Sequence, residues 1–193
     1  MIAGVVLAAG TSTRFGATKQ LVVLDGRPLV LHAVQTLRDG GIDTIMVVTG
    51  HDASKVRAVL PAEVIEVHNE RFRDGQATSL SVALHEVPDE AEAVIVLLAD
   101  QPGVTAEEVR ALIDAFRRSR ARIVRLRYLD GPGPALLSRE IFAEAAHLHG
   151  DAGARVLMAS HPEWVDDVPV DRPAPTDVDE PADLDAVKRA MPS

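Results

Sequence analysis

The chain has 193 residues, of which 47% are hydrophobic and only 3% aromatic, so it can bury one sizeable core built from aliphatic side chains. Its formal net charge of −9 argues against a nucleic-acid-binding surface, which needs a basic patch. The absence of cysteine excludes disulfides, a thiolate nucleophile and cysteine metal sites. We expect a single domain that does not bind nucleic acid.

The apolar runs and the N-terminus predict where the protein is found. No apolar run approaches the roughly 20 residues that a membrane-spanning helix needs. Met1 leads directly into a strand-like run, without the basic region that opens a secretion signal. We therefore expect a cytoplasmic protein with no membrane partner.

Strand-like and helix-like segments alternate along the first two thirds of the chain, which predicts an α/β fold with a mostly parallel sheet covered on both faces. Continuous apolar runs, typical of strands buried on both sides, lie at residues 2–7, 44–48, 64–67, 94–98 and 122–126. Helical patterns lie at residues 28–38, 52–60, 78–85 and 105–118. We expect Asp52 to cap the second of these helices and Thr105 with Glu108 to form a capping box on the last.

The pattern changes after residue 127. Residues 128–134 are rich in glycine and proline and predict a loop. Beyond it we expect a short strand at 135–137, helices at 138–148 and 152–159, an extended segment at 164–170 and a last helix at 181–189. Ligands of such sheets bind beyond the carboxyl ends of the strands, so residues that follow strands are the candidates for function.

Residues 7–19 follow the first strand and form the strongest candidate site. Small residues after a buried strand expose several backbone N–H groups, which makes an anion-binding concavity. Arg14 and Lys19 add two positive charges to the same loop. This pattern predicts a clamp for a nucleoside triphosphate, although an ordinary turn between strand and helix is the simpler alternative.

Asp100 follows the strand at 94–98 and points to a metal. If the first loop holds a triphosphate, this carboxylate is placed to bind Mg²⁺, which prefers one or two carboxylates together with substrate phosphates. The alternative is that Asp100 caps the next helix or begins a turn before Pro102.

Three further stretches carry candidates with a structural alternative beside each. Asn69, Gly75 and Ser79 could contact a base or sugar, or Ser79 could be a helix cap. Asp177 and Asp179 could bind metal, or could be favoured by the dipole of the helix that follows. A second substrate could be bound near residues 151–155, or this stretch could be a turn between helices. The candidates there are Asp151 and Arg155.

Taken together, these stretches resemble a known family. Residues 7–19 resemble the Leu-Ala-Ala-Gly-x-Ser-x-Arg-Met-Gly-x-x-Lys signature of nucleotidyltransferases, and residues 99–102, 150–155 and 177–181 extend the similarity along nearly the whole chain. Within that superfamily the chain looks most like the MobA-like proteins, and among them the MocA-like molybdenum cofactor cytidylyltransferases. The resemblance implies a three-layer α/β/α Rossmann-like nucleotidyltransferase fold with a mostly parallel central sheet.

The resemblance also implies roles for particular residues. Arg14, Lys19 and Asp100 would be catalytic, and Mg²⁺ would be held by Asp100 and Asp179, with Asp177 as a further candidate. The nucleotide would lie against Leu7, the backbone amides of Ala8, Ala9 and Gly10, the side chains of Arg14 and Lys19, and the segment containing Asn69, Gly75 and Ser79. The acceptor would contact Gln101, Asp151 and Arg155.

The activity implied is transfer of a CMP group from CTP to the terminal phosphate of molybdopterin, with release of pyrophosphate and delivery of the product to a molybdenum hydroxylase. Residues 1–105 would bind the nucleotide and residues 106–193 the acceptor. The family often has Gly-His-Pro where this chain reads Gly133-Pro134, which leaves acceptor identity open. The alternatives are another NTP with a sugar phosphate, phospholactate-like or methylerythritol phosphate acceptor, or a non-catalytic molybdenum cofactor carrier.

Overall fold

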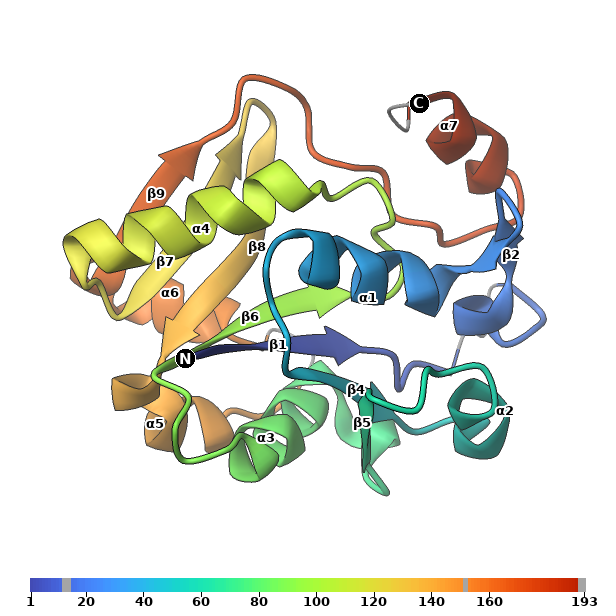
Figure 1. Cartoon of the computed structure of the whole chain (residues 1–193), viewed down its shortest axis with the longest axis horizontal. Helices are drawn as coiled ribbons and strands as arrows, with labels where there is room; N and C mark the ends of the chain where they lie inside the picture. Colours follow the sequence, from blue (N-terminus) through green and yellow to red (C-terminus); the bar gives the residue numbers. More distant parts are fainter. Residues whose placement is uncertain (12–14, 151–152, 191–193) are drawn as a thin grey trace.

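A computed structural model describes residues 1–11, 15–150 and 153–190. In this part of the chain seven strands form one sheet in the order β5-β4-β1-β6-β8-β7-β9 (Figure 1). Their bounds are β1 (Ile2–Leu7), β4 (Ile45–Thr49), β5 (Ile65–His68), β6 (Ala93–Leu98), β7 (Ile123–Tyr128), β8 (Gly131–Ser138) and β9 (Val165–Pro169). Only β8, of these described strands, runs antiparallel to its neighbours, so the predicted mostly parallel sheet is confirmed.

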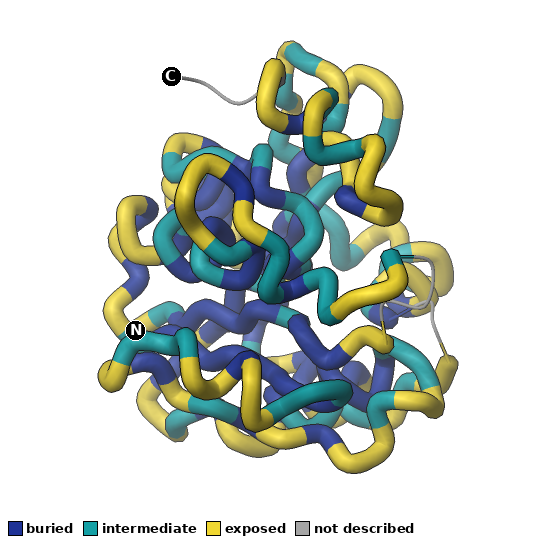
Figure 2. The backbone as a smooth tube through the Cα atoms, turned by 90° about the vertical axis from the view of Figure 1, so that its right-hand side faces the viewer, coloured by how far each residue is buried: buried dark blue, intermediate teal, exposed yellow. Residues whose placement is uncertain are grey.

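The continuous apolar runs form strands because both faces of the sheet are covered. Successive side chains of a strand point to opposite faces. In β1, Val6 packs into the apolar cluster on one face and Val5 into the cluster on the other. Met46 and Val47 of β4 divide in the same way. Figure 2 shows these buried segments in the middle of the molecule, between exposed outer loops.

Helices cover both faces, as the alternating pattern predicts. Helices α1 (Leu29–Asp39) and α4 (Ala106–Ser119) lie on one face, and α3 (Gln76–Glu86), α5 (Phe142–Ala146) and α6 (Arg155–Ser160) lie on the other (Figure 1). The predicted capping box on α4 is confirmed, because Thr105 and Glu108 bind each other's backbone N–H groups. None of the helices in the described ranges is both long enough and apolar enough to cross a membrane.

The remaining elements are short. They are η1 (Lys19–Leu21), β2 (Val23–Leu24), β3 (Arg27–Pro28), α2 (Ala53–Arg57), η2 (Phe72–Asp74), η3 (Arg139–Ile141), η4 (Pro162–Trp164) and α7 (Asp183–Ala190). Helix α2 ends before the predicted residue 60. Asp52 does occupy the N-cap position of α2, as predicted, but with a φ of 52° its side chain makes no cap hydrogen bond and binds Thr18 and Lys55 instead.

The loop predicted at 128–134 is wrong in part, because β8 already begins at Gly131. Only the second half of β8 pairs with β6, where Ala135 faces Val96, whereas its first half pairs with β7 alone. The prolines at 132 and 134 are tolerated in that first half because one side of the strand is unpaired there and needs no N–H donor.

A small third core connects the C-terminal segment to the hairpin formed by β2 and β3. Val178 is fully buried against Leu24 and Leu29, and Val187 of α7 completes the cluster. The N–H of Val178 also donates to the backbone carbonyl of Asp100 over 2.9 Å. The C-terminal segment is therefore fastened beside the end of β6.

Candidate active site

The site lies at the carboxyl ends of β1 and β6. Leu7 and Leu98, the last residues of these strands, are neighbours across the sheet. From β1 the chain crosses to β4 on one side, and β6 later joins the other side, so a crevice opens where the strand order reverses. A cavity of ≈ 510 Å³ fills this crevice, and its walls include Gly10, Thr11, Lys19, Gly75, Ser79 and Asp100. We call it the polar cavity.

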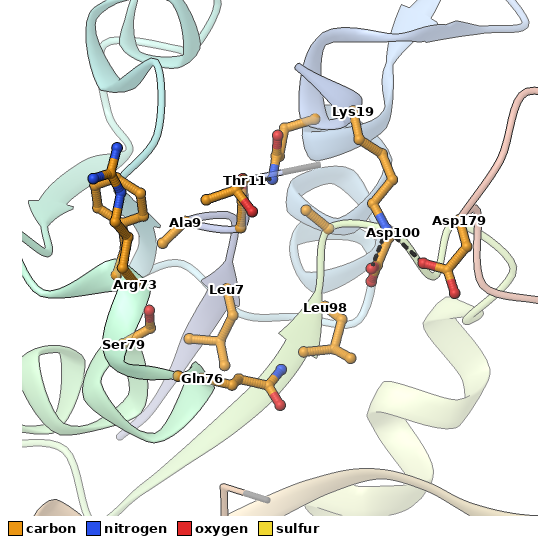
Figure 3. A pocket seen from close by; sticks show the side chains of 15 residues that line it. Leu7, Ala9, Thr11, Lys19, Arg73, Gln76, Ser79, Leu98, Asp100 and Asp179 are labelled. Atoms are coloured by element: carbon orange, nitrogen blue, oxygen red, sulfur yellow. Dashed lines mark hydrogen bonds and ion pairs between the residues drawn. The ribbon is translucent and has the colours of Figure 1, made fainter. Parts of the chain in front are cut away.

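Lys19 forms the centre of the charged wall of the polar cavity. Its Nζ lies 2.8 Å from Oδ2 of Asp100 and 3.0 Å from Oδ1 of Asp179 (Figure 3). Burial lowers the pKa of Lys19, but the two carboxylates more than offset this and hold the pKa above its ordinary value of 10.5. The structure thus joins two predicted residues that are 81 positions apart in the sequence.

The C-terminal segment carries two of the three carboxylates at this end of the cavity. Buried Val178 separates them, so Asp179 turns to Lys19 while Asp177 accepts a hydrogen bond from Nε2 of Gln101 over 2.7 Å. Burial raises the pKa of Asp177, the bond from Gln101 opposes this, and the nearby Asp100 and Asp179 carboxylates raise it further. The backbone N–H groups before α7 are bound by Asp183, which lies within the helix.

Asp100 and Asp179 suit a hard divalent cation. They already converge on one positive charge, and they offer only oxygen donors. Among the described residues no group of three or more His, Asp or Glu side chains could hold a metal alone. A cation bound here would therefore take further ligands from a substrate, which is how Mg²⁺ commonly binds between carboxylates and phosphates.

The loop after β1 forms another wall. Leu7, Ala9 and Gly10 line the polar cavity. Ala8 does not fit its predicted role as an amide donor, because its N–H donates to the carbonyl of Val48 in β4 over 2.9 Å. Gln20 holds the loop by donating to the carbonyl of Gly10. Arg14, predicted to bind phosphate, lies outside the described residues.

The loop before α3 forms the opposite wall. Gly75 has a φ of 105°, a conformation that glycine adopts without strain, and it allows α3 to begin at Gln76, two residues before the predicted start. Ser79 lies in the first turn and lines the cavity, so it is not the helix cap. Asn69 is buried and donates to both Thr78 and Ser79 over 2.9 Å. Asn69 therefore does not line the cavity itself, and its two hydrogen bonds hold the first turn of α3, which does.

A second, largely apolar cavity of ≈ 290 Å³ adjoins the first, between β8 and α6. Gln101 and Arg155, both predicted to bind the acceptor, lie in its wall. Asp151, the third predicted residue, lies outside the described residues. Arg125 lines the same cavity, and its guanidinium donates to both carboxylate oxygens of Asp167, at 2.8 and 2.9 Å. We call it the apolar cavity.

Arg73 and Gln76 are two polar residues of the polar cavity that the sequence did not single out. Arg73 lines it with its guanidinium 5.5 Å from the ring centroid of Phe72, and Gln76 lines both cavities. Both belong to the polar loop and helix start that already contained Asn69 and Gly75. The signal in the sequence is their position within two residues of Gly75, the glycine that precedes the helix.

Comparison with known proteins agrees with this geometry. The model of the MobA-like NTP transferase domain matches residues 4–165. Nicotine blue oxidoreductase of Paenarthrobacter nicotinovorans is 32% identical over 174 residues, which cover 86% of this chain and 85% of that protein. The crystal structure of Rv0371c from Mycobacterium tuberculosis H37Rv is 34% identical, with a TM-score of 0.86 and 97% of each chain covered. A crystal structure of Rv0371C in complex with manganese, also 34% identical with 97% of each chain covered, has a TM-score of 0.82. The chain belongs to the MobA-like NTP transferase family.

Proposed function

We propose that this protein is a Mg²⁺-dependent nucleotidyltransferase that moves a CMP group from CTP to the terminal phosphate of molybdopterin and releases pyrophosphate. One observation carries the proposal. The Lys19 ammonium and two carboxylates form one wall of a polar cavity at the carboxyl ends of β1 and β6, and an apolar cavity large enough for part of a second substrate opens beside it.

The polar cavity has the charges that a triphosphate needs. Lys19 supplies a positive charge, and the first turn of α3 directs its positive end to the cavity through Gly75, Gln76 and Ser79. Arg14 would add a planar pair of donors to the phosphates. With a divalent cation held by the two carboxylates, these groups would neutralise the negative charge of the triphosphate, the highly charged part of the nucleotide.

The reaction requires positioning more than acid–base chemistry. An oxygen of the acceptor phosphate attacks the α-phosphorus in line and the bond to pyrophosphate breaks, so the leaving group departs with its electron pair. The acceptor phosphate is already ionised at neutral pH, so no side chain has to remove a proton. Lys19 stabilises the negative charge that develops on the phosphate oxygens.

Asp100 and Asp179 would hold the Mg²⁺, with Asp177 beside them. When bound, the metal supplies charge neutralisation to the phosphates of the nucleotide. Lys19 then exchanges its carboxylate partners for phosphate oxygens, which keeps its charge satisfied in both states.

The apolar cavity would take the acceptor. Gln101 and Arg155 provide a polar amide and a positive charge in its wall, and the remaining wall suits a flat ring system. In this proposal residues 1–105 bind the nucleotide, with Asp179 as a contribution from the C-terminus, and residues 106–193 bind most of the acceptor.

Two measurements test the proposal. Each NTP is added with Mg²⁺ and the melting temperature is recorded. CTP at a hundred times its Kd should raise it by roughly 5 to 10 °C, because a ligand that binds only the folded state stabilises it. Pyrophosphate release is then followed with CTP and molybdopterin. We expect release with this pair and none after metal is removed with EDTA.

The alternatives give different results in the same experiment. Pyrophosphate release with another NTP, or with a sugar phosphate, phospholactate or methylerythritol phosphate, would assign the fold to a different nucleotidyl transfer. Binding of molybdenum cofactor without any pyrophosphate release would favour a carrier. If no NTP changes the melting temperature, the proposal is wrong.

A further inference from the structure

The polar and apolar cavities meet, and Gln76 lies at their junction. Leu7, Gln76 and Leu98 are the residues found in the walls of both cavities, and Gln76 is the polar one among them. Figure 3 shows the Gln76 side chain extending from the start of α3 toward Leu7 and Leu98. Any group that passes from a ligand in one cavity to a ligand in the other has to cross this place.

The backbone of Gln76 is held firmly. The N–H of the next residue, Ala77, donates to the carbonyl of Gly150 over 3.0 Å. The carbonyl of Gly75, which precedes Gln76, lies 2.8 Å from the Thr78 hydroxyl oxygen, and this hydroxyl shares its single proton between that carbonyl and the carbonyl of Arg71 at 3.0 Å. The side chain therefore starts from a fixed point, and the loss of freedom on binding a substrate is limited to its own rotamers.

The carboxamide of Gln76 can still donate and accept hydrogen bonds. The two other glutamines at the site are engaged, Gln20 with the carbonyl of Gly10 and Gln101 with Asp177. Across residues 1–11, 15–150 and 153–190, the Gln76 carboxamide makes no such bond. Its Oε1 lies near Gly153, which lines the apolar cavity, at 3.7 Å from the position a Cβ would take there.

We propose that Gln76 binds both substrates at this junction, its amide group donating to an oxygen of the α-phosphate and its carbonyl end facing the acceptor. This inference rests on the proposed function. A carboxamide carries a donor and an acceptor side by side, whereas Leu7 and Leu98 can only exclude water. The bond that forms joins the acceptor oxygen to the α-phosphorus, and the bond to pyrophosphate breaks. Gln76 gives and takes no proton and holds the reacting atoms in line.

The first test reads the side chain directly by NMR. In ¹⁵N-labelled protein, the NH₂ signal pair of Gln76 is identified by its loss in Gln76→Leu, or in Gln76→Ala as a second variant. We expect this pair to shift when CTP and Mg²⁺ are added, and to shift again on addition of molybdopterin. The Gln35 pair is the control, because Gln35 binds Asp39 on the outer side of α1 and should not move.

The NMR outcomes separate the two proposals. If backbone signals near Lys19 shift with CTP while the Gln76 pair stays in place, the inference on Gln76 is wrong and the nucleotide site stands. If no signal shifts with any NTP, the proposed function fails and the inference on Gln76 fails with it.

The second test separates binding from turnover. Gln76→Leu should lower kcat by about 10- to 100-fold, the usual effect of removing a hydrogen bond to a charged group, and should raise the Kd of CTP by a smaller factor, because the same bond also holds the bound nucleotide. If Gln76 had only a structural role, the substitution would change the melting temperature, and kcat would not fall by more than the Kd of CTP rises. Gln35→Leu is the matched control and should leave both quantities as in the wild type. An unchanged kcat in Gln76→Leu would overturn the inference.

Discussion

The polar and apolar cavities share one wall but are built in different ways. The charged wall of the polar cavity joins three chain segments at the Lys19 ammonium, through ion pairs to Asp100 at 2.8 Å and to Asp179 at 3.0 Å. The apolar cavity lies along β8 and α6, and Arg125, one of the two arginines in its wall, is already neutralised by Asp167. The polar cavity therefore offers charged groups at fixed positions, whereas most of the wall of the apolar cavity can select a ligand only by its shape.

Under the proposed function, this difference in the two walls indicates how far each cavity can discriminate between substrates. A charged wall binds the phosphates that every NTP shares, so it provides chemistry with little choice of partner. An apolar wall discriminates by fit, and such discrimination is modest for each group that is added or removed. We therefore expect mutations in the polar cavity to act on the rate and mutations in the apolar cavity to act on the acceptor.

The largest effect is expected for Asp100→Asn. It removes one of the two carboxylates that converge on Lys19 and leaves the fold intact, because Asp100 is held in place by the backbone bond from Val178. We expect pyrophosphate release to fall by about 10²- to 10³-fold.

Asp114→Asn is the matched control for this variant, since Asp114 is exposed on α4 away from both cavities. It should keep the wild-type rate. Near-normal turnover by Asp100→Asn would show that Asp100 has no catalytic role.

A smaller and more selective effect is expected for Ala159→Phe. Ala159 is exposed in the wall of the apolar cavity, so a phenyl ring can enter the cavity without overpacking the core. We expect the KM for the acceptor to rise about tenfold, equivalent to about 1.4 kcal/mol, while the Kd of the nucleotide is unchanged. Steady-state kinetics with each substrate varied in turn measure this split.

The matched control for the ring is Ala143→Phe, on the exposed side of α5 outside both cavities. If Ala159→Phe weakened nucleotide binding as much as acceptor binding, the assignment of one substrate to each cavity would be wrong.

Val178→Ala tests how the C-terminal segment supports the polar cavity. Val178 is fully buried, and removing two methyl groups should lower the free energy of unfolding by about 2 kcal/mol. We also expect a few-fold loss of rate, because Asp179 is no longer held firmly toward Lys19. Urea unfolding and pyrophosphate release measure the two effects. Val23→Ala, at a site 60% exposed, should change neither.

The smallest effect concerns pH. The carboxylates hold the pKa of Lys19 above 10.5, so the folded state favours the charged form. The stabilisation is therefore complete below pH 10.5 and is lost as the pH rises through the pKa of the folded protein. The difference in free energy of unfolding between wild type and Lys19→Met should stay constant up to that pH and shrink above it.

Lys188→Met provides the comparison for the pH measurement. Lys188 pairs with Asp25 at the surface with its side chain 63% exposed, so its removal should have little effect at any pH. A Lys19→Met difference that already declined between neutral pH and 10.5 would contradict the expected ion-pair network.

The sequence predicted most of the sheet but not the ends of its elements. Continuous apolar runs identify buried strands because both faces of a strand need apolar side chains. The start of β8 was missed because its prolines indicate a turn, and only pairing with β7 on one side makes them acceptable. Asp52 stands at the predicted N-cap position, but its side chain binds Thr18, a partner 34 residues away that the local pattern does not reveal.

Local sequence by itself determined where the seven strands of the main sheet lie, the phosphate-loop pattern and the identity of Lys19 and Asp100 as candidates, since each follows from residues that are close in the chain. Only the tertiary structure decided that Asp179 turns to Lys19, that the Ala8 amide is already used by β4, and that Gln76 lies where the two cavities meet. These facts depend on contacts between distant segments, and a buried valine or a shared cavity wall leaves no mark in the local pattern.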